Sequence, residues 1–104
     1  MAFVKVGELS KLPAGSVMEA MVGTESYAIC NIDGTLHALG GVCPHAGGPL
    51  GQGELEGGRL VCPWHAWQYD CRTGVNDFDE NIRLTTYNVK VNGDDILLDV
   101  PGGE

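Results

Sequence analysis

The apolar and polar residues of the chain are arranged as in short β-strands separated by turns. Apolar residues alternate with polar ones or form β-branched runs, and no segment of useful length has the three-to-four-residue spacing of an amphipathic helix. We therefore predict an all-β fold, a small sandwich or barrel. The predicted strands cover residues 3–6, 16–22, 26–32, 35–39, 54–56, 59–62, 66–69, 86–91 and 96–100.

Turn residues separate these strands and predict several hairpins. Gly23-Thr24-Glu25, Asp33-Gly34, Gly57-Gly58 and Asn92-Gly93-Asp94 each lie between two predicted strands. The segment 40–58 contains eight glycines and has little strand character. Because ordered loops of this length in a compact domain are usually functional, we expect a loop-built insert near residues 41–71 to carry the activity.

Length and charge restrict the function further. The chain has 104 residues, 43% of them hydrophobic, which suits one globular domain over residues 1–104. It lacks both a membrane-spanning apolar run and a leader-like start, so we expect a cytoplasmic protein. The formal net charge of −8 argues against binding to nucleic acid or anionic membranes and favours partners with basic patches.

Two short motifs in the insert each combine a thiol with an imidazole. They are Cys43-Pro44-His45 and Cys62-Pro63-Trp64-His65, and sixteen residues separate His45 from Cys62. Each has a proline directly after its cysteine, which fixes φ and removes a backbone donor. Two such loops facing each other would present two sulfur and two nitrogen ligands to one inorganic centre.

Three kinds of site are compatible with these residue types. Two cysteines and two histidines form a legitimate zinc site, although zinc motifs usually pair cysteine with cysteine and histidine with histidine. A Cys43–Cys62 disulfide is the second kind, and an acidic cytosolic chain disfavours it. The third kind is a Rieske cluster, in which one iron takes both thiolates and the other takes both imidazoles. Motifs that each contain one cysteine and one histidine suit this arrangement.

The segments CPHAGGPL and CPWHAWQYD closely resemble the C-x-H…C-x-x-H pattern of Rieske iron–sulfur proteins. Length and strand order are similar to those of free-standing Rieske ferredoxins over most of the chain. The resemblance implies one [2Fe–2S] cluster, with Cys43 and Cys62 on the buried iron and His45 and His65 on the outer iron. It also implies three antiparallel sheets, with a cluster-binding subdomain of about residues 41–71 inserted in a larger β-domain.

The same resemblance indicates where the reduction potential falls. Neutral imidazoles make the cluster less negative than an all-cysteine one, giving potentials of roughly −150 to +300 mV. High-potential relatives carry a disulfide at the positions of Gly48 and Trp64 and a serine donor at that of Trp67, and both are absent here. Tyr69 keeps the tyrosine position and is expected to donate to the thiolate of Cys43. We therefore predict a low-potential, oxygenase-type cluster.

Other residues near the motifs are expected to surround the cluster. We expect the backbone N–H groups of Gly47 and Gly48 to approach the cluster, and Pro49, Trp64 and Trp67 to shield it. Three further residues lie outside the motifs: Cys30 and Cys71 are interpreted as buried thiols, and His37 as a surface histidine.

The resemblance implies an electron carrier rather than an enzyme. Such a ferredoxin takes one electron from a reductase and passes it to a terminal oxygenase of the aromatic-ring-hydroxylating dioxygenase type. The chain shows no second set of His and Asp ligands that would activate oxygen. We expect it to act as a monomer. The alternative is a small subunit of an assimilatory nitrite reductase-like complex, which shares this size and fold.

Overall fold

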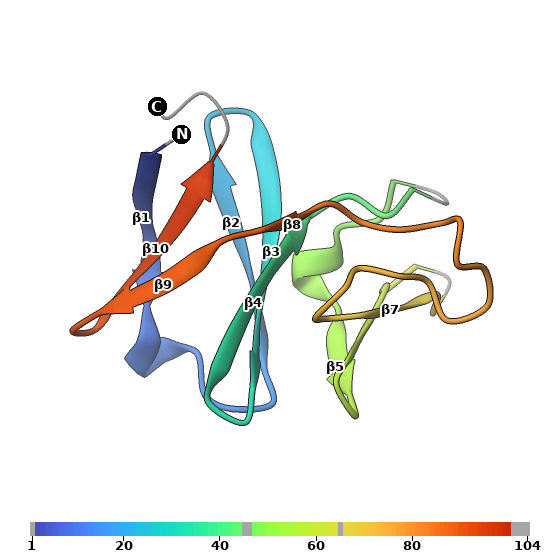
Figure 1. Cartoon of the computed structure of the whole chain (residues 1–104), viewed down its shortest axis with the longest axis horizontal. Coiled ribbons are helices and arrows are strands. Elements are labelled where there is room, and N and C mark those ends of the chain that lie inside the picture. Colours follow the sequence, from blue (N-terminus) through green and yellow to red (C-terminus); the bar gives the residue numbers. More distant parts are fainter. Residues whose placement is uncertain (1, 45–46, 65, 101–104) are drawn as a thin grey trace.

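The computed structural model describes residues 2–44, 47–64 and 66–100. Their strands form three antiparallel sheets, which confirms the predicted all-β class and the number of sheets (Figure 1). The strands are β1 (Ala2–Glu8), β2 (Val17–Val22), β3 (Glu25–Ile32), β4 (Thr35–Gly40), β5 (Glu54–Glu56), β6 (Arg59–Val61), β7 (Gln68–Asp70), β8 (Thr86–Tyr87), β9 (Val89–Asn92) and β10 (Asp95–Val100). Two short 3-10 helices, η1 (Leu9–Lys11) and η2 (Leu50–Gln52), complete the described elements.

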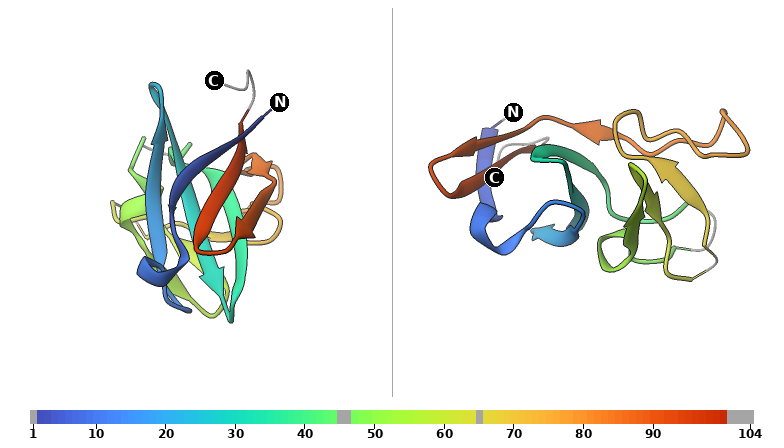
Figure 2. Two further views of the ribbon diagram at one scale, coloured as in Figure 1. Left: turned by 90° about the vertical axis from the view of Figure 1, so that its left-hand side faces the viewer. Right: turned by 90° about the horizontal axis from the view of Figure 1, so that it is seen from below.

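The three sheets follow one another along the long axis of the molecule. The four-stranded sheet β2-β3-β4-β8 lies between the sheet β1-β10-β9 at one end and the small sheet β5-β6-β7 at the other (Figures 1 and 2). All strands of the small sheet come from residues 54–70, within the segment that the sequence marks as an insert. The loops with the two cysteine motifs extend from this end.

Strand β3 contributes to two separate cores because its successive side chains point to opposite faces. Ala28 and Cys30 pack toward the small sheet, whereas Tyr27 and Ile29 pack toward β10. The first core contains Ala28, Cys30, Leu39, Cys43, Leu50, Leu60, Cys62, Tyr69, Cys71 and Leu84. The second contains Leu12, Ala20, Tyr27, Ile29, Ala38, Ile96, Leu98 and Val100.

Two of the hairpins turn through residues with positive φ. Asp33 and Gly34 have φ values of 53° and 94°, and Gly57 and Gly58 have values of 57° and 86°. Two consecutive positive φ values are the mark of the type I′ turn, whose twist matches that of the flanking strands. The buried Asn31 side chain supports the first turn, since its Oδ1 accepts the N–H of Gly34 at 2.8 Å.

One expectation, a single strand over residues 86–91, is corrected. The sequence predicts one strand over 86–91, but the chain changes sheets at Asn88: β8 pairs with β4, and β9 pairs with β10. His37, which we expected at the surface, is half-buried and lies opposite Cys30 in the paired strands β4 and β3. Neither short helix of the described residues is long and apolar enough to cross a membrane.

Candidate metal centre

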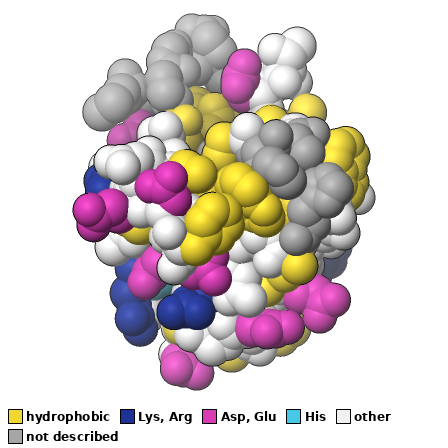
Figure 3. All heavy atoms as spheres, turned by 90° about the vertical axis from the view of Figure 1, so that its right-hand side faces the viewer, with side chains coloured by type: hydrophobic (Ala, Val, Ile, Leu, Met, Phe, Trp, Pro, Cys, Tyr) yellow, Lys and Arg dark blue, Asp and Glu magenta, His cyan; other side chains and the backbone are white. Residues whose placement is uncertain are grey.

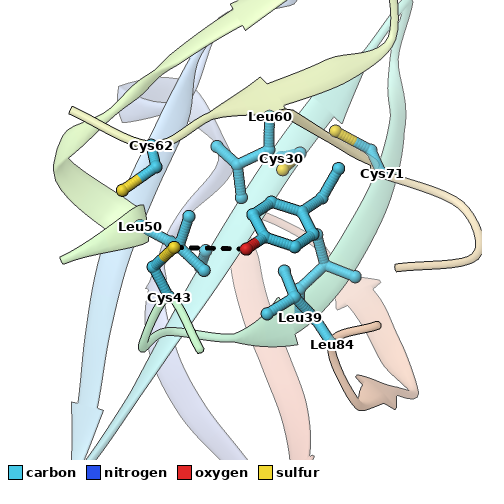
Figure 4. Packing of buried hydrophobic residues seen from close by; sticks show 10 residues of the cluster. Cys30, Leu39, Cys43, Leu50, Leu60, Cys62, Cys71 and Leu84 are labelled. Atoms are coloured by element: carbon cyan, nitrogen blue, oxygen red, sulfur yellow. Dashed lines mark hydrogen bonds between the residues drawn. The ribbon is translucent and has the colours of Figure 1, made fainter. Parts of the chain in front are cut away.

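Cys43 and Cys62 lie together at the edge of the first core. Cys43 follows β4, Cys62 follows β6, and each has only 1% of its surface exposed. Figure 4 shows both sulfur atoms on the same side of this core, beside Leu50 of η2. Two chain segments far apart in sequence thus bring two thiols into one water-poor location.

The loops that follow the two cysteines have the same hydrogen-bond pattern. In the first loop (residues 43–48), the N–H of Gly47 donates to the carbonyl of Cys43 at 2.8 Å, and the N–H of Cys43 donates to the carbonyl of Gly48 at 2.9 Å. In the second loop (residues 62–67), the corresponding bonds are Ala66 to Cys62 at 3.0 Å and Cys62 to Trp67 at 2.8 Å. The two loops are therefore structural equivalents.

The backbone conformation confirms this equivalence. The fifth residue of each loop has a positive φ, 76° at Gly47 and 60° at Ala66. Glycine adopts this conformation without strain, whereas in alanine the Cβ makes an unfavourable contact with the backbone. The second loop therefore holds a strained residue directly after His65.

The two loops touch each other at Gly48. A Cβ atom at this residue would lie 2.8 Å from the Sγ of Cys62 and 3.2 Å from the ring of Trp64. Gly48 is therefore required for close packing rather than for a positive φ. Gly48 and Trp64 are also the positions at which high-potential Rieske proteins are expected to carry a disulfide, and here the indole of Trp64 packs on Gly48 instead.

Tyr69 reaches the first cysteine from β7. Its side chain is fully buried, and its hydroxyl oxygen lies 3.2 Å from the Sγ of Cys43 (Figure 4). Burial raises the pKa of the Tyr69 hydroxyl, and the bond to Cys43 raises it further. Tyr69 is therefore a neutral hydroxyl, and it donates whenever Cys43 is a thiolate.

A third loop, residues 76–83, lies against the second, and the sequence did not indicate how it is built. Asn76 is 4% exposed, and its Oδ1 accepts the N–H groups of Phe78 and Asp79 at 3.0 and 3.1 Å. The ring of Phe78 packs edge-on against the half-buried Trp67, with centroids 4.7 Å apart. An asparagine before Asp77 is typical of such turns.

The remaining expected site residues are placed as follows. Pro49 is half-buried, precedes η2 and forms a β-bridge with Val42, whereas Trp64 is 57% exposed. His45 and His65 lie outside the described residues. Among the described residues there is no group of three or more possible metal ligands. Of the four expected cluster ligands, the described residues include Cys43 and Cys62.

The residues that are described suit a two-cysteine metal centre. Two buried thiols project from equivalent loops, a neutral hydroxyl points at one sulfur, and glycine leaves room between the loops. Thiolates bound to iron accept hydrogen bonds, and such bonds tune the metal centre. The fold and these loops define a small β-protein with a buried two-cysteine site at one end.

The comparisons with known proteins identify the family. Residues 2–88 match the family of Rieske [2Fe–2S] domains. Over 104 residues the chain is 33% identical to the ferredoxin component of biphenyl 2,3-dioxygenase from Rhodococcus jostii (strain RHA1), covering 99% of this chain and 97% of that protein. The chain belongs to the Rieske [2Fe–2S] family, and its cofactor is one Rieske-type [2Fe–2S] cluster.

Solved structures have the same fold. The ferredoxin of carbazole 1,9a-dioxygenase from Nocardioides aromaticivorans IC177 superposes with a TM-score of 0.84 at 25% identity, covering 94% of this chain and 97% of that one. A ferredoxin seen in a complex with the reduced oxygenase of carbazole 1,9a-dioxygenase has a TM-score of 0.82 at 22% identity, covering 92% of this chain and 91% of that one. At 22% identity, this second comparison shows similarity of fold and nothing more.

Proposed function

We propose that Cys43 and Cys62 hold the buried iron of the cluster and that His45 and His65 hold the outer iron. The observation that carries this assignment is the pair of buried cysteines at the start of two hydrogen-bonded loops of equal geometry. Cys30 and Cys71 are buried too, but neither begins such a loop. We further propose that residues 41–71 act as the cluster-binding subdomain within a single domain of residues 1–104.

The function that this site supports is one-electron transfer. When bound, the cluster accepts one electron and releases it again. We propose that the chain receives the electron from a reductase and delivers it to a terminal oxygenase of the ring-hydroxylating type, as the names of its relatives indicate for those systems. The formal net charge of −8 suits a carrier that docks on partners with basic patches.

The chain's own residues set the properties of this carrier. The first core excludes water from the two thiolates, and the Tyr69 hydroxyl stabilises the more negative, reduced state by its bond to Cys43. The disulfide and the serine donor of high-potential relatives are replaced by Gly48, Trp64 and Trp67. We therefore propose a low potential within the Rieske range of roughly −150 to +300 mV.

The ligand assignment is tested by substitution and electron paramagnetic resonance. We expect four variants to abolish the Rieske signal of dithionite-reduced protein. His45→Cys and His65→Ala should do so because both imidazoles on one iron define that signal. Cys43→Ala and Cys62→Ala should do so because each removes a thiolate ligand of the other iron. Cys30→Ala and Cys71→Ala are the matched controls and should keep it. A colourless, zinc-loaded wild-type protein that fails to acquire the signal after anaerobic iron–sulfide reconstitution would contradict the assignment.

The electron-carrier function is tested with a reconstituted system. Reductase and oxygenase components of the biphenyl 2,3-dioxygenase from Rhodococcus jostii are mixed with the wild-type chain, and substrate hydroxylation is measured with and without it. We expect NADH-dependent product only when all three proteins are present. Chemically reduced chain should also reduce the oxygenase directly in stopped-flow absorbance. Failure of the chain to be reduced by the reductase and to reduce the oxygenase would contradict this function.

The alternative, a small subunit of a nitrite reductase-like complex, has fold-level support only. A protein described as an NADH-dependent nitrite reductase small subunit from Mycobacterium tuberculosis has a TM-score of 0.81 at 19% identity, covering 93% of each chain. Stable co-purification with a sirohaem subunit would favour this alternative. For the carrier function we propose a cytoplasmic monomer, and sedimentation of the cluster-loaded protein tests the oligomeric state.

A further inference from the structure

Phe78 is a large apolar residue that the fold leaves exposed to solvent. Phe78 is 62% exposed, although hydrogen bonds hold the backbone of its loop. The buried Asn76 fixes this loop by accepting two backbone N–H groups and by donating from Nδ2 to the carbonyl of Gln68 at 3.2 Å. A rigid loop that exposes an aromatic ring is pre-organised for contact, since little entropy remains to be lost on binding.

Two exposed aromatic residues border the second cysteine loop: Trp64 belongs to this loop, and Phe78 packs against its Trp67. Val42, Trp64 and Phe78 come from three different loops and are each more than half exposed. Figure 3 shows hydrophobic side chains gathered in the middle of one face of the molecule. Isolated exposed apolar residues are ordinary, but a patch of them marks an interaction site.

Acidic residues lie near these aromatic side chains. Asp77 and Glu80 are exposed on either side of Phe78 in the third loop, and Glu54 lines a hollow of about 340 Å³ together with Trp64. Acidic side chains flank the hydrophobic ones on this face in Figure 3. Arg83 offsets part of the negative charge, and its Nη2 donates to the carbonyl of Glu80 at 3.4 Å. An apolar centre with an acidic rim is complementary to a partner with an apolar recess and a basic rim.

We infer that Phe78 is the anchor by which this chain docks on its terminal oxygenase, and that the acidic residues beside it steer the approach. This inference rests on the proposed function. The edge-on contact between Phe78 and Trp67 places the anchor directly against the second cysteine loop. A partner that covers Phe78 therefore also lies beside the metal centre. Aromatic residues at the centre of an interface are frequently those whose truncation weakens binding most.

The inference is tested by Phe78→Ala in the reconstituted biphenyl 2,3-dioxygenase system. We expect the second-order rate constant for electron transfer to the oxygenase to fall about tenfold, while the electron paramagnetic resonance signal and the reduction potential stay unchanged. Phe78→Tyr keeps the ring and should retain the wild-type rate within about twofold. Phe3→Ala is the matched control, because Phe3 is 42% exposed on β1 at the opposite end of the molecule.

Three results would overturn the inference. One is a wild-type rate in Phe78→Ala. Another is a changed potential together with the lower rate, which would mean that Phe78 acts by positioning Trp67. The third is a loss confined to the reductase step, which would make the reductase the occupant of this surface. Each is distinct from failure of the proposed function, in which the wild-type chain itself transfers no electrons.

Discussion

The hydroxyl oxygen of Tyr69 lies 3.2 Å from the sulfur of Cys43 in the first core. This contact joins β7 of the small sheet to the loop that begins at a proposed iron ligand. Because burial raises the pKa of Tyr69, its hydroxyl keeps its proton and donates to the thiolate. A donor to a metal-bound sulfur stabilises the reduced state more than the oxidised state, so this single bond is expected to raise the reduction potential.

Tyr69→Phe should therefore lower the reduction potential. The substitution removes one hydroxyl and little volume, so packing should persist. The reduction potential depends only on how much stronger the Tyr69–Cys43 hydrogen bond is in the reduced state than in the oxidised state. A difference of about 1 kcal/mol in the free energy of this bond corresponds to roughly 40 mV for one electron. Protein-film voltammetry measures the change. Tyr27→Phe is the matched control, since Tyr27 is buried in the second core against Tyr87 and should leave the potential unaltered. Equal potentials for wild type and Tyr69→Phe would contradict the role of this bond.

Gly48→Ala should destabilise the metal centre. The added Cβ meets the Sγ of Cys62 at 2.8 Å and the Trp64 ring at 3.2 Å, so the two loops must separate. Overpacking of this kind costs about 1–3 kcal/mol. We expect a lower thermal midpoint and faster loss of visible absorbance. In the control Gly40→Ala, the new Cβ has only the Thr85 carbonyl oxygen near it, at 3.9 Å. Equal midpoints for the two variants would refute the proposed close packing.

Ala66→Gly should stabilise the protein. Ala66 has a φ of 60°, a conformation that costs an alanine about 1–2 kcal/mol, and glycine removes the Cβ responsible. The greater freedom of glycine in the unfolded chain offsets part of this gain, which leaves about 0.5–1 kcal/mol. Thermal unfolding of the cluster-loaded protein measures this gain in stability. Ala14→Gly is the control: this exposed alanine lacks a positive φ, so the same substitution should give no gain. A lower midpoint in Ala66→Gly would disprove the strain.

Electron transfer to the partner should weaken with salt. The chain carries a formal charge of −8, and attraction to a basic partner is screened as ionic strength rises. Between about 0.01 M and about 0.15 M salt, the screening length falls from about 30 Å to about 8 Å. The second-order rate constant measured by stopped flow should fall over this interval. The neutralising variant Glu80→Gln should show a shallower salt dependence than wild type. A rate that is flat in salt would mean that docking is purely apolar.

Several features of the fold are local and could be predicted from the sequence. Strands β2, β3 and β10 follow from alternating or β-branched runs, and the type I′ turn at Gly57 and Gly58 follows from glycine's tolerance of positive φ. The pairing of a cysteine with a histidine in each motif indicates the kind of cluster from the order of residues alone. These predictions succeed because neighbouring residues alone decide them.

Other features depend on segments that are distant in sequence. The change of sheets at Asn88 is invisible in the pattern of residues 86–91, because both halves of that run are extended and only their partners differ. The position of Phe78 could not be predicted either, since its contact with Trp67 joins two separate loops. The buried Asn76 decides it by fixing the backbone on which Phe78 lies.

The sequence by itself determined the class of fold and the kind of cluster, because alternation and the order of residues within a motif are local properties of the chain. Tertiary structure decided which of these residues touch. It placed Tyr69 of β7 on Cys43, packed Gly48 of the first loop against Trp64 of the second, and put Phe78 against Trp67. The physical reason is that contact between side chains requires close packing of elements whose relative positions no single segment encodes.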